Sequence, residues 1–389
     1  MPDALQEFAR ELSYFESVRL SDSPVRFDAA SGMYSVFSYT DVVGVLRNSD
    51  EFSNTPPGAA YESRNAMLFT DPPHHRDLRT LVSKAFTPAS IAKLEGRLRE
   101  IIGELMEGIG DSPTFDVVSR IAAPLPEIMI AEMLGVDPES RSKFKDWSRS
   151  FSMVVTSQAN VTTGLDQHTK VLEEMFDHFD PIIAERRIRP RDDLITRLVQ
   201  AEAEGNRLTM EELRATCAQL LAAGNETTTN LIGNAVICLT QRPDLLIQAR
   251  TEPELVPGII EEVLRYLGPA QFVPRYVKKT ATLQGHTLEP GTPVLAMLAS
   301  ANRDKDAFDD PDEFDPRRRP NRHLGLGSGI HFCLGSALAR LEAKVALEHM
   351  ITHLDGEWSI GEELERLPDV PFFFGVTSLP LTVSPGRTR

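Results

Sequence analysis

Apolar and polar residues alternate in two different ways along the chain, and these patterns predict where helices and strands lie. Over residues 24–38, apolar positions alternate with polar ones on either side of the Ser31-Gly32 turn, which predicts a short hairpin. From residue 40 to about residue 267 the apolar spacing is mostly helical, and helical spacing returns after Cys333. Short strands are expected at 282–284 and 293–296, and extended structure at 372–381. We therefore predict a mainly α fold with a small β region.

The longest predicted helix covers residues 210–239 and is poor in charge. Thr209 and Glu212 have the spacing of a capping box at its start. From Ala215 to Leu239 the only charged residue is Glu226, and at ~1.5 Å per residue this stretch spans roughly 38 Å. A membrane span is the alternative interpretation, but the stretch holds many polar residues that are costly in lipid, namely Gln219, Asn225, Thr227, Thr228, Thr229, Asn230 and Asn234. We expect a buried helix through the middle of a large domain.

The composition is that of an ordinary globular protein, because 41% of the 389 residues are hydrophobic and 25% are charged. No Gly/Ser-rich or Pro-rich linker and no repeat divides the chain, so we expect one domain over residues 1–389 and a monomer. The net charge of −16 argues against nucleic-acid binding. The first residues lack a basic region followed by an apolar core, so no signal peptide or membrane anchor is expected. Cys217, Cys238 and Cys333 lack paired spacing, which indicates the reducing cytoplasm.

A glycine-rich loop, residues 324–335, surrounds Cys333. Glycines at 325, 327 and 329 would let the backbone approach a flat ligand closely. A cysteine that opens a helix would feel the helix dipole, which favours the thiolate and hence metal ligation. No second cysteine lies at the spacing of a zinc site. The alternative is a buried structural cysteine beside a flexible loop.

The loop resembles the haem-ligand signature of the cytochrome P450 family, which reads aromatic-Gly-x-Gly-x-(His or Arg)-x-Cys-x-Gly. Gly327, Gly329, His331, Cys333 and Gly335 match this pattern, whereas Leu326 replaces the usual aromatic residue. The resemblance implies the family's mainly helical fold and a haem b cofactor with Cys333 as its iron ligand. Thiolate ligation of haem iron pushes electron density toward the iron and favours O–O cleavage.

A second motif lies inside the long helix, at Ala223-Gly224-Asn225-Glu226-Thr227. Gly224 weakens a helix interior by about 1 kcal/mol relative to alanine, and threonine hydroxyls bond back to carbonyls one turn earlier. The segment resembles the family's (Ala or Gly)-Gly-x-(Asp or Glu)-Thr motif. The resemblance implies an oxygen-binding groove at Gly224, with Thr227 as the alcohol and Glu226 as the acid of a proton relay. The alternative is a helix kink with a glutamate that faces solvent.

A third motif, Glu262-x-x-Arg265, places an acid and a base on one helix face. Most such pairs are exposed and contribute little to stability. The position of this pair between the long helix and the cysteine loop resembles the family's Glu-x-x-Arg motif, which pairs with a later arginine. Arg318 is the candidate for that arginine, and Glu313 stands where some relatives carry it. The implied role is structural.

Haem carries two propionates, which need cationic or hydrogen-bonding partners. His75 and Arg79 lie one helical turn apart in a segment that resembles the bacterial Asp-Pro-Pro-x-His-x-x-x-Arg motif. Arg275 and His331 match two further propionate-binding positions. Each residue taken alone could be a surface charge, and His74 is expected to be a bystander.

The resemblance implies a haem-thiolate monooxygenase that hydroxylates a C–H bond, with electrons from NAD(P)H through a ferredoxin reductase and a ferredoxin. A peroxide-driven peroxygenase and a haem-based gas sensor are the alternatives. A peroxygenase needs no proton relay, so the acid–threonine pair argues against it. A gas sensor needs an output domain, which the sequence does not show. The substrate is expected to be hydrophobic, of the fatty-acid, steroid, terpenoid or macrolide type. The predicted contacts with it are Ala222, Ala223, Ala270, Gln271, Phe372 and Phe373.

Basic residues gather around the cysteine loop, in contrast to the acidic net charge. Between Phe314 and Lys344 basic residues outnumber acidic ones, and the acidic ones are Asp315 and Glu342. A solvated charge cluster is the alternative, but the location favours a docking face for an acidic electron donor. The basic residues are Arg317, Arg318, Arg319, Arg322, Arg340 and Lys344.

Overall fold

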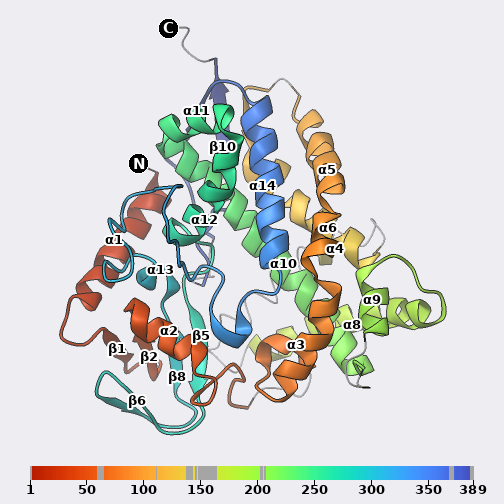
Figure 1. The fold of residues 1–389 in the computed structure, drawn as a ribbon, viewed down its shortest axis with the longest axis vertical. Coiled ribbons are helices and arrows are strands. Elements are labelled where there is room, and N and C mark those ends of the chain that lie inside the picture. Colours follow the sequence, from red (N-terminus) through yellow and green to blue (C-terminus); the bar gives the residue numbers. More distant parts are fainter. Residues whose placement is uncertain are drawn as a thin grey trace.

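One helix, α10 (Met210–Gln241), runs through the middle of the protein and is contacted by helices from both halves of the chain (Figure 1). The computed structural model describes residues 2–58, 65–110, 112–136, 143–144, 147, 164–201, 205, 207–367 and 372–385. Thr209 accepts from the Glu212 backbone and Glu212 accepts from the Thr209 backbone, which confirms the predicted capping box. No helix in the described ranges is long and apolar enough to cross a bilayer. The prediction of a buried central helix is therefore confirmed.

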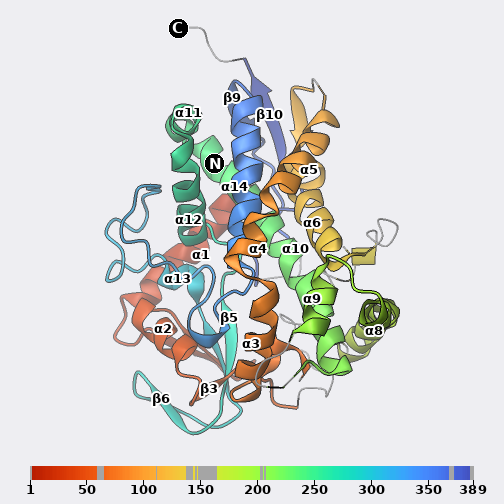
Figure 2. The ribbon, with the colours of Figure 1, turned by 45° about the vertical axis from the view of Figure 1, so that its right-hand side comes forward.

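Twelve further α-helices surround α10 in the described ranges, and four of them (α6, α8, α12 and α14) pack against it most extensively (Figure 2). They follow the apolar spacing of the sequence and are α1 (Asp3–Arg19), α2 (Tyr39–Arg47), α3 (His74–Ala85), α4 (Pro88–Ala92), α5 (Glu95–Glu107), α6 (Pro124–Leu134), α8 (Gly164–Ile188), α9 (Leu194–Gln200), α11 (Pro243–Thr251), α12 (Val256–Tyr266), α13 (Leu298–Ala301) and α14 (Ser336–His353). The mainly α prediction is confirmed.

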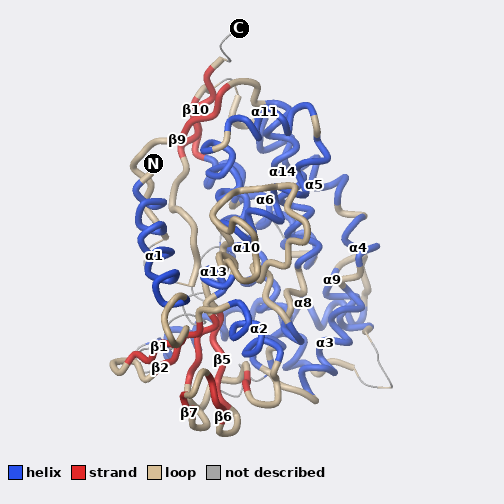
Figure 3. The backbone as a smooth tube through the Cα atoms, turned by 60° about the vertical axis from the view of Figure 1, so that its left-hand side comes forward, coloured by secondary structure: helices blue, strands red, loops and turns tan. Residues whose placement is uncertain are grey.

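The strands lie at two opposite ends of the protein, outside the helical core (Figure 3). The larger sheet has the order β1-β2-β8-β5-β3, in which the predicted hairpin pairs Val25 with Val36 and strand β2 runs parallel to β8. The strands are β1 (Val25–Asp28), β2 (Met33–Val36), β3 (Phe52–Ser53), β4 (Thr114–Asp116), β5 (Val273–Val277), β6 (Ala281–Leu283), β7 (His286–Leu288), β8 (Pro293–Ala296), β9 (Glu357–Ile360) and β10 (Pro380–Ser384).

Two sequence predictions about strands need correction. The pattern did not predict β5, which lies between β8 and β3 in the larger sheet and carries Arg275. The extended structure expected at 372–381 is mostly irregular, with isolated bridges at Phe373 and Val376, and the strand β10 begins only at Pro380. Residues 372–374 do pair with residues 269–271, through the Gln271 N–H to the Phe372 carbonyl and the Phe374 N–H to the Pro269 carbonyl, but this pairing is too short to form a strand.

Candidate active site around Cys333

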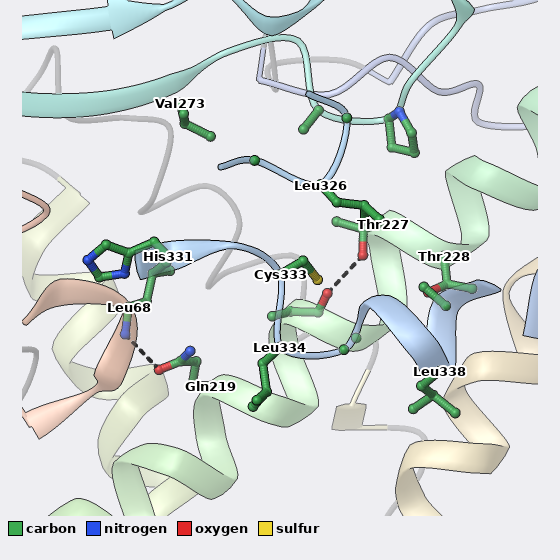
Figure 4. A pocket seen from close by; sticks show the side chains of 18 of the residues that line it. Leu68, Gln219, Thr227, Thr228, Val273, Leu326, His331, Cys333, Leu334 and Leu338 are labelled. Carbon is green, nitrogen blue, oxygen red and sulfur yellow. Dashed lines mark hydrogen bonds between the residues drawn. The ribbon is translucent and has the colours of Figure 1, made fainter. Parts of the chain in front are cut away.

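A cavity of about 310 Å³ reaches from the cysteine loop to the middle of α10 (Figure 4). Cys333 and Thr227 both line it, from the loop and from α10 respectively. Five of the six predicted substrate contacts also line it, and these are Ala222, Ala223, Ala270, Phe372 and Phe373. Gln271 departs from the prediction, because it is buried outside the lining and donates its Nε2–H to the Gly268 carbonyl.

The loop around Cys333 holds its shape through one short helical turn and through backbone bonds, one of them from the Gly327 N–H to the Leu324 carbonyl over 2.8 Å. Residues Gly329–His331 form a 3-10 turn, and the Cys333 N–H donates to the Leu326 carbonyl over 3.0 Å. Helix α14 begins at Ser336, three residues later than the sequence suggested. The pKa of the Cys333 thiol is raised by burial, against smaller opposing effects of the Gly335 N–H, Arg79 and Arg340.

Two of the three loop glycines lie close to the backbone of other helices. A Cβ at Gly325 would lie 2.3 Å from the Leu264 carbonyl oxygen of α12, and one at Gly329 would lie 2.6 Å from the Leu46 carbonyl oxygen of α2. Gly327, with φ of +73°, lines the cavity and has no close neighbour. Gly325 also lines the cavity, so Gly325 and Gly327 lie where the backbone could approach a ligand, whereas Gly329 does not belong to the lining.

The motif on α10 is built as the sequence predicted at its threonine. The Thr227 hydroxyl donates to the Ala223 carbonyl one turn earlier, over 2.9 Å. Gly224 lines the cavity, and a Cβ there would meet nothing within 4 Å, so the wall is open at this point. Glu226 is half-buried and does not belong to the lining. Thr227 therefore faces the cavity directly, and Glu226 stands behind it on the same helix.

Helix α14 contributes a buried carboxyl group to the wall of the cavity, although the sequence counted this residue among the charges around the cysteine loop. Glu342 is 2% exposed and lines the cavity, and it shares a hydrogen bond with Thr228 of α10. Burial raises its pKa to about 8, partly offset by that bond. Its spacing from Leu338 and Val345 on the apolar face of α14 was the signal in the sequence that could have shown its burial.

Four nitrogen donors gather at the edge of the cavity from three separate segments. His75 and Arg79 come from α3, Arg275 from β5 and His331 from the cysteine loop, and the rings of His75 and His331 lie 4.1 Å apart. The Nε2 atoms of both histidines are buried without a hydrogen-bond partner. No described carboxylate forms an ion pair with Arg79 or Arg275. The structure thus brings together all four predicted propionate ligands.

Burial governs the charge of this donor cluster. It lowers the pKa of His75 to about 4 and, together with His75, Arg275 and Arg79, that of His331 to about 2. It also lowers the pKa of Arg275 to about 10, partly offset by Asp71. At neutral pH the arginines remain charged and each neutral histidine has one N–H to donate. Buried donors without acceptors are costly, so the cluster fits an anionic group such as a haem propionate.

A buried ion pair on α12 connects this helix to the segments around Asn302, Glu313 and Arg318. Glu262 and Arg265 are fully buried and form two bonds, of 2.9 Å and 2.7 Å. Arg318 adds a third group, because its Nε lies 3.2 Å from Glu262 Oε1. Arg265 also donates to the carbonyls of Asn302 and Glu313, so Glu313 takes part through its backbone and not its side chain.

The basic face predicted around the loop is largely neutralised by carboxylates from other segments. Glu342 is buried and does not belong to this face. Arg322 is exposed and has no carboxylate partner within the described ranges. Four of the six basic residues are paired, as Arg317–Glu252, Arg318–Glu262, Arg340–Glu261 and Lys344–Glu95. The free positive charge is therefore smaller than the sequence indicated.

Comparison with known proteins gives the same picture over nearly the whole chain. Residues 28–382 match the cytochrome P450 family. Erythromycin C-12 hydroxylase of Saccharopolyspora erythraea is 39% identical over 348 residues, which cover 86% of this chain and 85% of the relative. Cytochrome P450 109 of Bacillus spizizenii is 40% identical over 367 residues, which cover 93% and 89%.

Solved structures agree with the sequence comparison. The structure of CYP109E1 from Bacillus megaterium in complex with corticosterone has a TM-score of 0.85 and 38% identity, over 96% of this chain and 98% of that one. The structure of CYP109Q5 from Chondromyces apiculatus has a TM-score of 0.86 and 40% identity, over 97% and 96%. Bacterial proteins of this kind use haem and act on hydrophobic molecules. This chain belongs to the cytochrome P450 family and is a cytochrome P450 monooxygenase.

Proposed function

We propose that this enzyme binds haem b through Cys333 and inserts one oxygen atom of O2 into a C–H bond of a small hydrophobic substrate. The observation that carries the proposal is the shared cavity, since Cys333 and Thr227 face it from different segments and its remaining walls are mostly apolar. Haem bound there would supply the iron at which dioxygen is reduced and activated. Arg79, Arg275, His75 and His331 would hold its propionates.

Thr227 and Glu226 would deliver protons to the oxygen-binding groove beside Gly224. The hydroxyl hydrogen of Thr227 is directed to the Ala223 carbonyl, so the lone pairs of its oxygen remain free to accept a hydrogen bond in the cavity. Glu226, the residue directly before Thr227 in the chain, is a half-buried carboxyl group. The hydroxyl would orient a proton donor, and the carboxyl would replace the proton that is used.

Separate proteins would supply the electrons, from NAD(P)H through a ferredoxin reductase and a ferredoxin. The exposed Arg322 beside the cysteine loop supports an acidic donor at that face. Three free cysteines support a reducing cytoplasm as the compartment. We further propose that residues 1–389 form one haem domain that acts as a monomer.

Several relatives support a large, mostly apolar substrate. One relative is named a hydroxylase of erythromycin, a macrolide, and two solved structures contain the steroids corticosterone and testosterone. The apolar lining of the cavity supports a substrate of the steroid or macrolide class.

The proposal is tested by replacing the ligand and by comparing the sources of oxygen. We expect Cys333→Ser to lose the Soret signature of thiolate-ligated haem in the carbon-monoxide difference spectrum, whereas Cys238→Ser, a buried cysteine at the far end of α10, keeps it. We also expect product with O2, NAD(P)H, reductase and ferredoxin, and little with hydrogen peroxide alone. Full turnover by Cys333→Ser would overturn the ligand assignment, and efficient turnover with peroxide alone would favour a peroxygenase.

A further inference from the structure

An amide side chain on α10 stands in the apolar wall of the cavity and has one side fixed. Gln219 is 8% exposed and lines the cavity. Its Oε1 accepts the Leu68 N–H over 3.1 Å, and Figure 4 shows this bond. The Leu68 carbonyl is held in turn by Nδ2 of Asn54 over 2.9 Å. The backbone of Leu68 is therefore held through both its N–H and its carbonyl, and it positions the Gln219 amide.

This arrangement determines which way the Gln219 amide faces. Only the oxygen of a glutamine amide can accept a backbone N–H, so the opposite rotation would set two donors against each other. The Nε2 group is therefore directed away from Leu68, and no residue in the described part of the chain accepts a bond from it. A largely buried amide N–H donor on a cavity wall is costly to leave unsatisfied.

The position of Gln219 on α10 determines how far a substrate group bound to it would lie from the oxygen-binding groove. Gln219, Ala223 and Thr227 succeed one another at one-turn spacing on α10, and all three line the cavity. Gln219 and Thr227 are eight residues apart, which is about 12 Å along a helix. A molecule that contacts Gln219 with one end can thus place its other end near the oxygen-binding groove.

The charges of the wall indicate a neutral partner. Arg79 and Arg275 are the cations among the described lining residues, and the proposed function assigns both to the propionates. A substrate carboxylate would find no further described cation at this wall. A carbonyl or hydroxyl oxygen needs only a donor, and Gln219 Nε2 provides one.

We propose that Gln219 determines substrate specificity by donating its free Nε2–H to a carbonyl or hydroxyl oxygen of an uncharged, otherwise apolar substrate. The inference rests on the proposed function, because it takes the cavity to be the substrate site. Its substrate class is a hydrophobic molecule with an acceptor oxygen about 12 Å from the carbon that is oxidised.

The test compares two probes that differ only in one oxygen, 5α-androstan-3-one and the parent hydrocarbon 5α-androstane, by calorimetric titration of the holoenzyme. We expect wild type to prefer the ketone by about tenfold, the ratio that one hydrogen bond to a buried donor provides. Gln219→Leu and Gln219→Glu should both reduce this ratio toward one. Gln219→Glu is the sharper variant, because its carboxyl oxygen can still accept from Leu68 while the donor is gone. The control is Gln241→Leu, the same change at an exposed position of α10.

The outcomes separate this inference from the proposed function. A preference for the ketone that survives Gln219→Glu, or a wild type that does not prefer the ketone, would overturn the role of Gln219, whatever the enzyme turns over. A preference that Gln219→Glu and Gln219→Leu abolish and Gln241→Leu keeps would support it, even if wild type made no hydroxylated product with ferredoxin. That last result would count against the monooxygenase proposal alone.

Discussion

The backbone N–H of Cys333 donates to the carbonyl oxygen of Leu326 over 3.0 Å, so the two residues are held together across the cysteine loop. Leu326 also lines the cavity and packs against the hydrophobic core. Leucine therefore stands where the family pattern has an aromatic residue, and it fills less space than a ring.

This contact predicts that Leu326→Phe lowers the reduction potential of the haem. Reduction adds negative charge to the iron–thiolate unit, and a larger apolar side chain shields the sulfur from water, which makes that charge more costly. Spectroelectrochemistry on the two proteins measures the difference. Leu341→Phe, on α14 outside the cavity lining, serves as the control. Equal potentials in wild type and Leu326→Phe would show that residue 326 is a neutral packing position.

Replacing Thr227 should uncouple the consumption of NAD(P)H from product formation. Thr227→Val keeps the shape of the side chain but removes its oxygen, so we expect several-fold more hydrogen peroxide per NAD(P)H consumed. Thr227→Ser keeps the hydroxyl and should remain closer to wild type. Parallel assays of NAD(P)H, peroxide and product measure the coupling, and equal coupling in Thr227→Val and wild type would remove Thr227 from the relay.

Charge reversal should separate Arg322 from Lys344. Arg322→Glu introduces a negative charge at an exposed, unpaired position, so reduction by an acidic ferredoxin should slow several-fold at low salt and less at high salt. Lys344 pairs with Glu95 and Glu348, so Lys344→Glu should instead lower the melting temperature through like-charge repulsion. Stopped-flow reduction at two salt concentrations and thermal unfolding check both. A rate that does not respond to Arg322→Glu would place the donor elsewhere.

The buried Glu342 should make stability depend on pH. Its pKa is about 8 in the folded protein, whereas the ordinary value for an exposed glutamate is 4.5. Between these pH values the folded protein therefore binds more protons than the unfolded chain. Stability is therefore greatest below about pH 4.5 for this group and falls as the pH rises toward 8. Glu342→Gln removes this contribution and should gain stability relative to wild type at pH 8 more than at pH 5. Denaturant unfolding at the two pH values measures it, and an equal difference at both would contradict the raised pKa.

Local signals account for the parts of the fold that the sequence predicted well. The capping box of Thr209 and Glu212 and the stretch after it, which is poor in charge, define α10 within the chain itself. Strand β5 has no such signal, because it contains Pro274 and owes its place to partners far away in the sequence. Its identity as a strand is determined by the completed sheet.

The same distinction applies to the site. The motifs placed Cys333 and Thr227 on one cavity because each has a strong local pattern. The basic face was overestimated because each arginine was visible in the sequence, whereas its carboxylate partner lies in another segment, as with Arg317 and Glu252. Gln219 could not be singled out, since its role depends on the Leu68 peptide, which only the fold brings to it.

The close contacts of Gly325 and Gly329 have a consequence for mutational tolerance. Neither position has room for a Cβ, because a backbone carbonyl of α12 or α2 occupies that space. The loop therefore packs against both helices at positions where only the Hα of glycine fits. Gly327 has the same left-handed backbone as Gly329, but the nearest atom to a Cβ there would be the His331 carbonyl oxygen at 3.8 Å, an ordinary contact. In a saturation library scored for haem incorporation, asparagine and aspartate should therefore survive at 327, where left-handed residues are accepted, while positions 325 and 329 should return glycine alone.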